Sequence, residues 1–121
     1  MSAINPIRHA LPLACALVAF GLAVGAARAD EAQETAYKDY HGAIEAAKLC
    51  EKRSFDQPAH GKMARVIDEK IDYAIGAGRR LTLIEQVKSE VYKLVWYKGC
   101  ASEPVSRLLA LFHAELEPAL Q

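Results

Sequence analysis

Cys50 and Cys100 are the residues of this chain whose chemistry decides most about it. They lie fifty positions apart in a sequence of 121 residues. In an oxidising compartment two such thiols form a disulfide, whereas in a reducing one they stay as separate buried thiols. In the loop-entropy description, a bridge closing about fifty residues stabilises a fold by about 4 kcal/mol. We expect the disulfide, because a chain this short buries only a modest core.

Histidine and methionine side chains are the candidates for metal or haem chemistry. His60 and Met63 lie three residues apart, so one helix face could offer copper a nitrogen and a thioether. We favour another interpretation, in which His60 packs against Phe55 at a helix start and Met63 belongs to the core. His41 and His113 flank the apolar stripes of the first and last expected helices and could ligate haem, but the sequence has no Cys-x-x-Cys-His attachment motif. We expect no metal and no cofactor.

Recognisable catalytic motifs are missing from the sequence. It contains no Cys-x-x-Cys, His-Glu-x-x-His or Gly-x-Ser-x-Gly pattern and no glycine-rich phosphate loop. The 15 basic and 15 acidic residues leave no formal net charge, so no strongly basic face is available for nucleic acid. We expect neither an enzyme nor a nucleic-acid-binding protein.

The N-terminal segment has the pattern of an export signal. Residues 10–27 are almost entirely apolar, follow Arg8, and lead into the Ala-Arg-Ala sequence of residues 27–29. A signal peptidase requires small side chains at the first and third of these positions. We expect cleavage after this sequence, which gives a signal peptide of residues 1–29 and a single helical domain of residues 30–121. The alternative is a retained anchor, since about eighteen apolar residues are at the lower limit for a membrane span.

Signal cleavage would also decide the redox state of the cysteines. It would remove Cys15 and leave Cys50 and Cys100 as an even pair. Exported proteins seldom keep free thiols, so this pairing agrees with a periplasmic or secreted location. No membrane span would remain after cleavage.

Apolar residues recurring at three- and four-residue steps predict four helices. The first covers residues 31–52 and has an alanine-rich inner face. Asp56 is a good N-cap for the second, which we expect to end at the glycines of residues 76–78. Arg79 and Arg80 would then lie at a helix C-terminus, where cations are favourable.

Capping residues also mark the two later helices. Thr82 and Glu85 match a capping box at the start of the third helix, which we expect to end at Gly99. Ser102 would cap the fourth helix, and Pro118 would end it. Since no segment alternates apolar and polar residues, we expect no strand. The predicted fold class is all-α, with a four-helix bundle or an orthogonal four-helix cluster and one disulfide.

Three aromatic residues near the end of the third helix are the candidates for partner binding. Tyr92 and Trp96 lie four residues apart, beside the apolar stripe, and Tyr97 points to the opposite side. Tyr92 and Trp96 either cover the edges of the core or form an exposed patch. We favour the core-edge interpretation for these two.

The signal peptide, the mature length of about ninety residues, the helical pattern and the Cys50–Cys100 pair together resemble the periplasmic acid-stress chaperones of the HdeA kind. The likeness is architectural and covers most of the mature chain. It implies a state that is inactive at neutral pH and often dimeric. In acid such a protein loosens and exposes apolar surface to unfolding clients, while the disulfide limits its expansion.

These observations lead to one main hypothesis and two alternatives. The main one is a small exported binding protein, stress-related or chaperone-like, with a protein partner or an unfolded client. The first alternative is an accessory or structural subunit that docks on another envelope protein through Tyr92, Trp96 and Tyr97 or through the alanine face of the first helix. The weaker alternative is a small metal or haem carrier. A homodimer is compatible with the first two.

Overall fold

The described part of the chain folds as four α-helices followed by two short helical turns. The computed structural model describes residues 29–121. The elements are α2 (Glu31–Cys50), α3 (Gln57–Lys70), α4 (Ala77–Lys98), α5 (Glu103–Leu111), the π-helical turn η2 (Phe112–Leu116) and the 3-10 turn η3 (Glu117–Leu120). Residues 29–121 contain no strand, so the predicted all-α fold is confirmed. The predicted signal peptide, apart from Ala29, lies outside the described residues.

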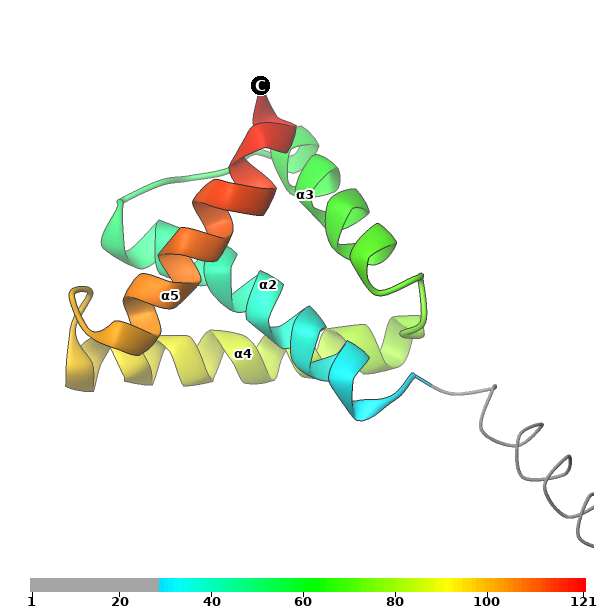
Figure 1. Cartoon of the computed structure of the whole chain (residues 1–121), viewed down its shortest axis with the longest axis horizontal. Helices are drawn as coiled ribbons and strands as arrows, with labels where there is room; N and C mark the ends of the chain where they lie inside the picture. The colour runs from blue at the N-terminus through cyan, green and yellow to red at the C-terminus, as the bar shows by residue number, and fades with distance from the viewer. Residues whose placement is uncertain (1–28) are drawn as a thin grey trace, which may run out of the picture.

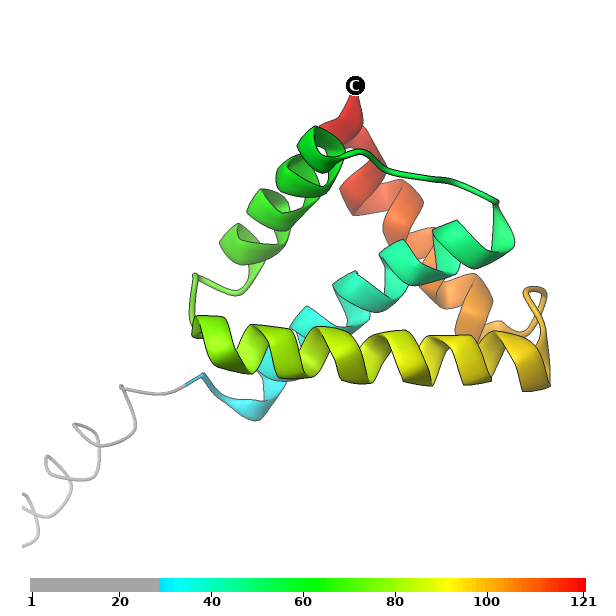
Figure 2. The same ribbon diagram turned by 180° about the vertical axis from the view of Figure 1, so that it is seen from behind.

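The helices cross one another instead of running side by side (Figure 1). α4 lies along one edge of the molecule, and α3 and the C-terminal turns converge at the opposite corner (Figure 2). α2 is the central element, because it packs on α4, on α5 and on η2. Of the two arrangements that the sequence allowed, the chain adopts the cluster of crossing helices and not the up-down bundle.

α2 begins at a capping box and ends close to its predicted end. The Asp30 carboxylate accepts a hydrogen bond from the backbone N–H of Gln33 at 2.8 Å, and the Asp30 N–H donates to Gln33 Oε1 at 3.0 Å. The helix ends at Cys50, two residues before its predicted end at residue 52. Lys52 adopts a φ of 57°, a left-handed conformation that an α-helix cannot continue through.

α3 starts as predicted. Asp56 Oδ1 accepts a hydrogen bond from the backbone N–H of Ala59 at 2.9 Å. Pro58 lies in the first turn, where its missing N–H needs no partner.

The predicted end of this helix at residues 76–78 is wrong, since α3 stops at Lys70. The N–H of Tyr73 donates to the carbonyl of Asp68 at 2.8 Å, and the N–H of Asp72 donates to that of Glu69 at 3.2 Å. These are the two bonds of a Schellman motif. The turn has φ values of 55° at Asp72 and 54° at Tyr73, and aspartate tolerates this conformation without glycine.

The predicted capping box of the third helix is also wrong. α4 begins at Ala77, with Gly76 in the extended N-cap conformation, a position that glycine occupies readily. Thr82 lies inside the helix, and its hydroxyl donates to the carbonyl of Gly78 at 3.3 Å. The glycines expected to end one helix therefore begin the next, and Glu85 has no capping role.

Arg79 and Arg80 consequently lie in the first turn of α4, and the expected C-terminal position is wrong. A cation at this positive end of a helix is unfavourable by itself, and both residues are paired with carboxylates of other helices. Arg79 Nε and Nη2 lie 2.9 and 2.7 Å from the two oxygens of Glu34. Arg80 Nη1 and Nη2 each lie 3.1 Å from an Asp68 oxygen, and its Nε donates to the carbonyl of Ile75 at 2.7 Å. The two arginines thus tie α4 to α2 and α3.

The C-terminal α-helix ends at Leu111, before its predicted end at Pro118, but helical turns of other types continue past this proline. Ser102 has the N-cap conformation and Pro104 lies in the first turn of α5, as predicted, although the Ser102 hydroxyl donates to the carbonyl of Gly99 at 2.7 Å and makes no capping bond. Helical turns continue through η2 and η3 to Leu120. Pro118 falls in the first turn of η3, so it does not interrupt them.

Cys50 and Cys100 form the predicted disulfide, with their Cα atoms 5.7 Å apart. The bond joins the end of α2 to the turn between α4 and α5. It therefore closes the corner at which α2, α4 and α5 meet.

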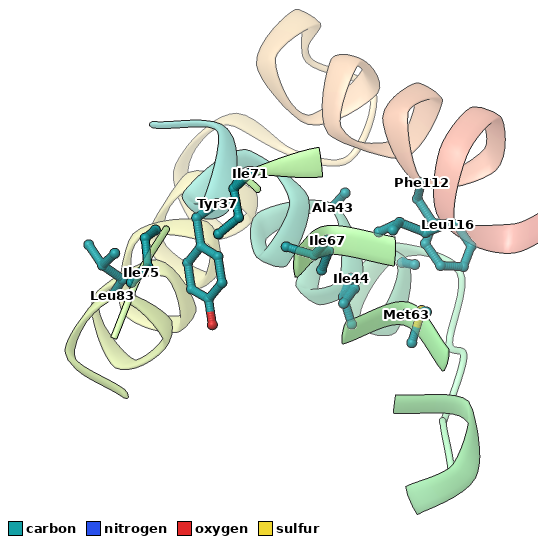
Figure 3. Packing of buried hydrophobic residues seen from close by; sticks show 11 residues of the cluster. Tyr37, Ala43, Ile44, Met63, Ile67, Ile71, Ile75, Leu83, Phe112 and Leu116 are labelled. Carbon is teal, nitrogen blue, oxygen red and sulfur yellow. The ribbon is translucent and has the colours of Figure 1, made fainter. Parts of the chain in front are cut away.

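The main core lies where α2, α3 and the C-terminal turns meet (Figure 3). The largest fully buried side chains are Phe112, Met63, Ile67, Ile71, Leu83, Leu116 and Val105. A second cluster of Ala46, Val87, Val91 and Val105 lies between α2, α4 and α5. Within residues 29–121 no charged residue is buried.

Candidate binding sites

An open apolar groove of about 750 Å³ runs between α2, α4 and α5. Its volume lies in the range of pockets that bind small molecules or peptide side chains. Its apolar lining consists of Gly42 of α2, Val87, Val91 and Leu94 of α4, and Pro104, Leu108, Ala110 and Leu111 of α5. The second core cluster lies directly beneath this surface, because Val87 and Val91 belong to both.

Gly42 sets the depth of the groove. A Cβ atom at this position would lie 3.4 Å from Val91 Cγ2, 3.5 Å from Leu108 Cδ2 and 3.6 Å from Val87 Cγ1. These are ordinary contact distances, so the floor has space for one methyl group and no more. The glycine leaves that space open.

Charged side chains of both signs surround the groove. Lys38 Nζ lies 3.3 Å from Glu90 Oε1, so this ion pair joins α2 to α4. Asp39 and Arg107 line the groove beside it, and Arg107 pairs with Glu103 of its own helix at 3.0 Å. Desolvation raises the pKa of the Asp39 carboxyl. An apolar floor with a rim of mixed charge suits an amphipathic segment that has both charge signs.

The three aromatic residues of α4 are exposed, so the core-edge interpretation is wrong for Tyr92 and Trp96. The exposed fractions are 58% for Tyr92, 74% for Trp96 and 80% for Tyr97. The inner face of α4 is made by Leu83, Val87 and Val91. Tyr92 and Trp96 follow Val91 by one and five residues, so they lie on the other side of the helix and face solvent.

His41 is a half-buried titratable group with a large pKa shift. Its ring centroid lies 4.5 Å from that of Tyr37, and it lines a smaller pocket of about 220 Å³ between the helices. Burial lowers its pKa to about 4, the opposing effect of Asp68 being smaller. The positive charges of Arg80 and Lys88 act in the same direction as burial.

The candidate copper pair does not form a site. Met63 is fully buried in the core, while His60 is exposed and packs edge-on against Phe55, with ring centroids 5.9 Å apart. This is the arrangement that the favoured interpretation predicted. In the described ranges, no group of three or more His, Cys, Asp and Glu side chains is placed to hold a metal ion.

His113, the second candidate haem ligand, has both ring nitrogens beside carboxylates. Nε2 lies 2.6 Å from Glu51 Oε2 and Nδ1 lies 3.0 Å from Glu117 Oε1. These contacts leave neither nitrogen directed at open space.

Sequence reasoning did not identify the groove. Leu94 and Leu108, which line the groove, are only partly buried. The available signal was Gly42, a glycine in the middle of an alanine-rich helix.

None of the helices in residues 29–121 combines the length and the apolar character that crossing a bilayer requires. Comparisons with known protein families, with curated proteins and with solved structures find no match to this chain.

Proposed function

We propose that this protein is a small exported binding protein that holds an apolar segment of another polypeptide in the groove between α2, α4 and α5. The groove itself is the main observation in support. About 750 Å³ of open space over Val91, Leu94 and Leu108 is a large apolar opening for so small a domain. The mixed charges of the rim favour a polypeptide over a purely apolar ligand.

Export is supported by the cysteine pair. Cys100 is exposed and disulfide-bonded to Cys50. A bond so accessible to reductants persists only in an oxidising compartment. The periplasm or the cell exterior is therefore the proposed location.

A stress-related, chaperone-like role in acid is supported by His41. Its pKa of about 4 means that the folded state resists protonation. Below the ordinary histidine pKa of 6.5, an exposed His41 would take up a proton that the buried side chain excludes. Acid therefore favours states in which the packing of α2 on its neighbours is looser. Loosening would widen the groove at the pH where client proteins also unfold. The proposed role requires no catalytic step.

The groove is tested with a tryptophan that fills it. Ala110 is exposed on α5 and lines the groove, so Ala110→Trp should occupy the space without disturbing the core. Ala32 is exposed in the first turn of α2 and does not line the groove, and Ala32→Trp is the matched control. The assay is light scattering by citrate synthase as it aggregates, in heat at neutral pH and in acid at about pH 3.

We expect the wild-type protein and Ala32→Trp to suppress aggregation, with more suppression in acid. Ala110→Trp should require at least about fivefold more protein for the same suppression, since one large side chain replaces the contact surface of the client. The proposal is wrong if the wild-type protein protects at neither pH. It is also wrong if a folded Ala110→Trp protects as well as the control.

A further inference from the structure

The outward face of α4 forms a second surface, separate from the groove. We propose that Tyr92, Trp96 and Tyr97, together with the neighbouring lysines, dock the folded protein on an anionic phospholipid surface. This inference does not depend on the proposed groove function.

The aromatic side chains form a strip on the exposed side of α4, with Tyr92 and Trp96 in one row and Tyr97 beside that row, not directly opposite to it. Tyr92 and Trp96 are four residues apart, and Lys93 precedes Trp96 by three residues and Tyr97 by four. Residues at these spacings are neighbours on a helix surface, so Lys93 lies between the rings of the strip. α4 forms an edge of the molecule (Figure 2), which leaves the strip accessible along the C-terminal half of the helix.

Lysines dominate the charge of this half of the helix. Lys88, Lys93 and Lys98 are all exposed, but Lys98 follows Leu94 by four residues and Val91 by seven, so it lies on the side of α4 that carries the buried stripe. Among the described residues, Lys93 forms no ion pair, and Lys88, four residues before Tyr92, has only a loose one with Glu85 at 3.9 Å. These ammonium groups are therefore available to an external anion.

Acidic residues are scarce around the strip. The sequence has none between Glu90 and Glu103. The Glu90 carboxylate is engaged by Lys38 of α2 at 3.3 Å, so it offsets little of the lysine charge. The strip is thus aromatic and positively charged.

This combination fits a lipid surface better than a protein surface. Tryptophan and tyrosine are enriched at the level of lipid headgroups, because their rings are apolar and their tips are polar. Lysine stems can lie along such a surface while the ammonium group meets the phosphate. Lysine is in contrast depleted at the centres of protein interfaces.

Trp96 provides the measurement, because it is the only tryptophan of the chain. The purified protein is titrated with vesicles of phosphatidylglycerol and phosphatidylcholine, and separately with vesicles of phosphatidylcholine alone. We expect a blue shift of Trp96 emission and protection from acrylamide quenching with the anionic vesicles only. Raising the salt concentration should reverse both effects, since the attraction is screened.

Charge and ring variants test which residues are responsible, with vesicle sedimentation as the readout. Lys88→Glu/Lys93→Glu should weaken binding by more than tenfold, since each lysine near an anionic surface contributes about fivefold. Lys62→Glu/Arg65→Glu on α3 changes the charge equally at two exposed positions away from the strip and should bind nearly as wild type. Tyr92→Ser/Tyr97→Ser should also weaken binding, whereas Tyr73→Ser, at an exposed tyrosine outside α4, should not.

Every variant has the same N-terminal residues, so differences between them report on α4. The proposal is overturned if anionic vesicles do not shift Trp96 emission, or if the two double charge variants weaken sedimentation equally. Burial of Trp96 by a protein partner in the absence of lipid, without any vesicle binding, would likewise overturn it and assign the strip to a protein contact.

Discussion

His113 Nε2 lies 2.6 Å from Glu51 Oε2, a contact between residues 62 positions apart. The other ring nitrogen, Nδ1, lies 3.0 Å from Glu117 Oε1. A neutral imidazole has one N–H and one lone pair and can donate to only one of these carboxylates, whereas the imidazolium ion donates to both. The hydrogen bonds to Glu117 and Glu51 therefore raise the pKa of His113. Because Glu51 follows Cys50, the cation clamps the C-terminal turns to the disulfide-bonded end of α2.

The clamp predicts stability that is lost at alkaline pH. A raised histidine pKa contributes fully below the ordinary value of 6.5, and the contribution disappears as the pH rises through the raised pKa. The His113 side chain is 42% exposed, so solvent screening limits the effect to about 1 kcal/mol or less. Urea unfolding of the wild type and His113→Gln should differ at about pH 5.5 and converge near pH 9.

His60→Gln is the control for this comparison, because His60 is exposed and forms no ion pair within residues 29–121. The loss of stability at alkaline pH that His113 causes should persist in this variant. A His113→Gln profile parallel to that of the wild type would show that the clamp does not depend on the imidazolium.

His41 predicts a pH dependence of the opposite sign. Its folded-state pKa of about 4 lies below its unfolded value of 6.5, mainly because of burial. As the pH falls from 6.5, the unfolded chain takes up a proton that the folded chain excludes, so stability decreases and levels off below about pH 4. The full cost is about 3 kcal/mol. His41→Leu should remove this acid slope in urea unfolding, and an unchanged slope would contradict the assignment.

The sequence predicted helix starts better than helix ends. Asp56 and Ser102 could be located because their side chains or their backbone positions follow simple capping rules. The end of α3 could not, because Asp72 and Tyr73 adopt the left-handed conformation that the glycine rule assigned to residues 76–78. The choice between those two turns depends on tertiary contacts such as the Arg80–Asp68 pair.

The binding surfaces were predicted only in part. Periodicity identified the residues near the apolar stripe of α4, but it does not say how far a neighbouring helix covers that stripe. The crossing of α2 and α5 over α4 leaves Leu94 and Leu108 at the groove and exposes Trp96. Helix crossing is a property of the assembled core, so no local pattern could specify it.

Arg80 and Arg79 are predicted to differ in their contribution to stability although both bind a carboxylate through two nitrogens. The Arg80 side chain is 31% exposed, its partner Asp68 is 17% exposed, and Arg80 also donates to the carbonyl of Ile75. Its removal leaves partly buried acceptors unpaired, so Arg80→Ala should cost about 1–3 kcal/mol. Arg79 is 51% exposed, so Arg79→Ala should cost less than Arg80→Ala, because solvent screens an exposed ion pair. Urea unfolding at neutral pH measures both, and equal losses would contradict this ranking.

Gly42 and Gly61 allow stability to be separated from binding. Both lie inside helices, where alanine is more favourable than glycine by about 0.5–1 kcal/mol. A Cβ at Gly61 meets no atom within 4 Å, and one at Gly42 meets side chains at ordinary contact distances. Each alanine variant should therefore raise the midpoint of urea unfolding. Only Gly42→Ala adds a methyl group to the groove floor, so only this variant should weaken client binding. If Gly42→Ala instead lowers the midpoint of urea unfolding, the floor has no space for the methyl group.

The disulfide is predicted to supply a large share of the folding free energy. Closing a loop of about fifty residues restricts the unfolded chain and contributes about 4 kcal/mol in the loop-entropy description. Small domains have total stabilities of only about 5–15 kcal/mol, so reduction of Cys50–Cys100 should bring the chain close to unfolding. Cys50→Ser/Cys100→Ser should reproduce the effect of reductant on the wild type, measured by urea unfolding. Mass spectrometry after alkylation of the protein as isolated from its cells should find neither sulfur modified. Two alkylated cysteines in that native sample would contradict both the bond and the oxidising compartment inferred from it.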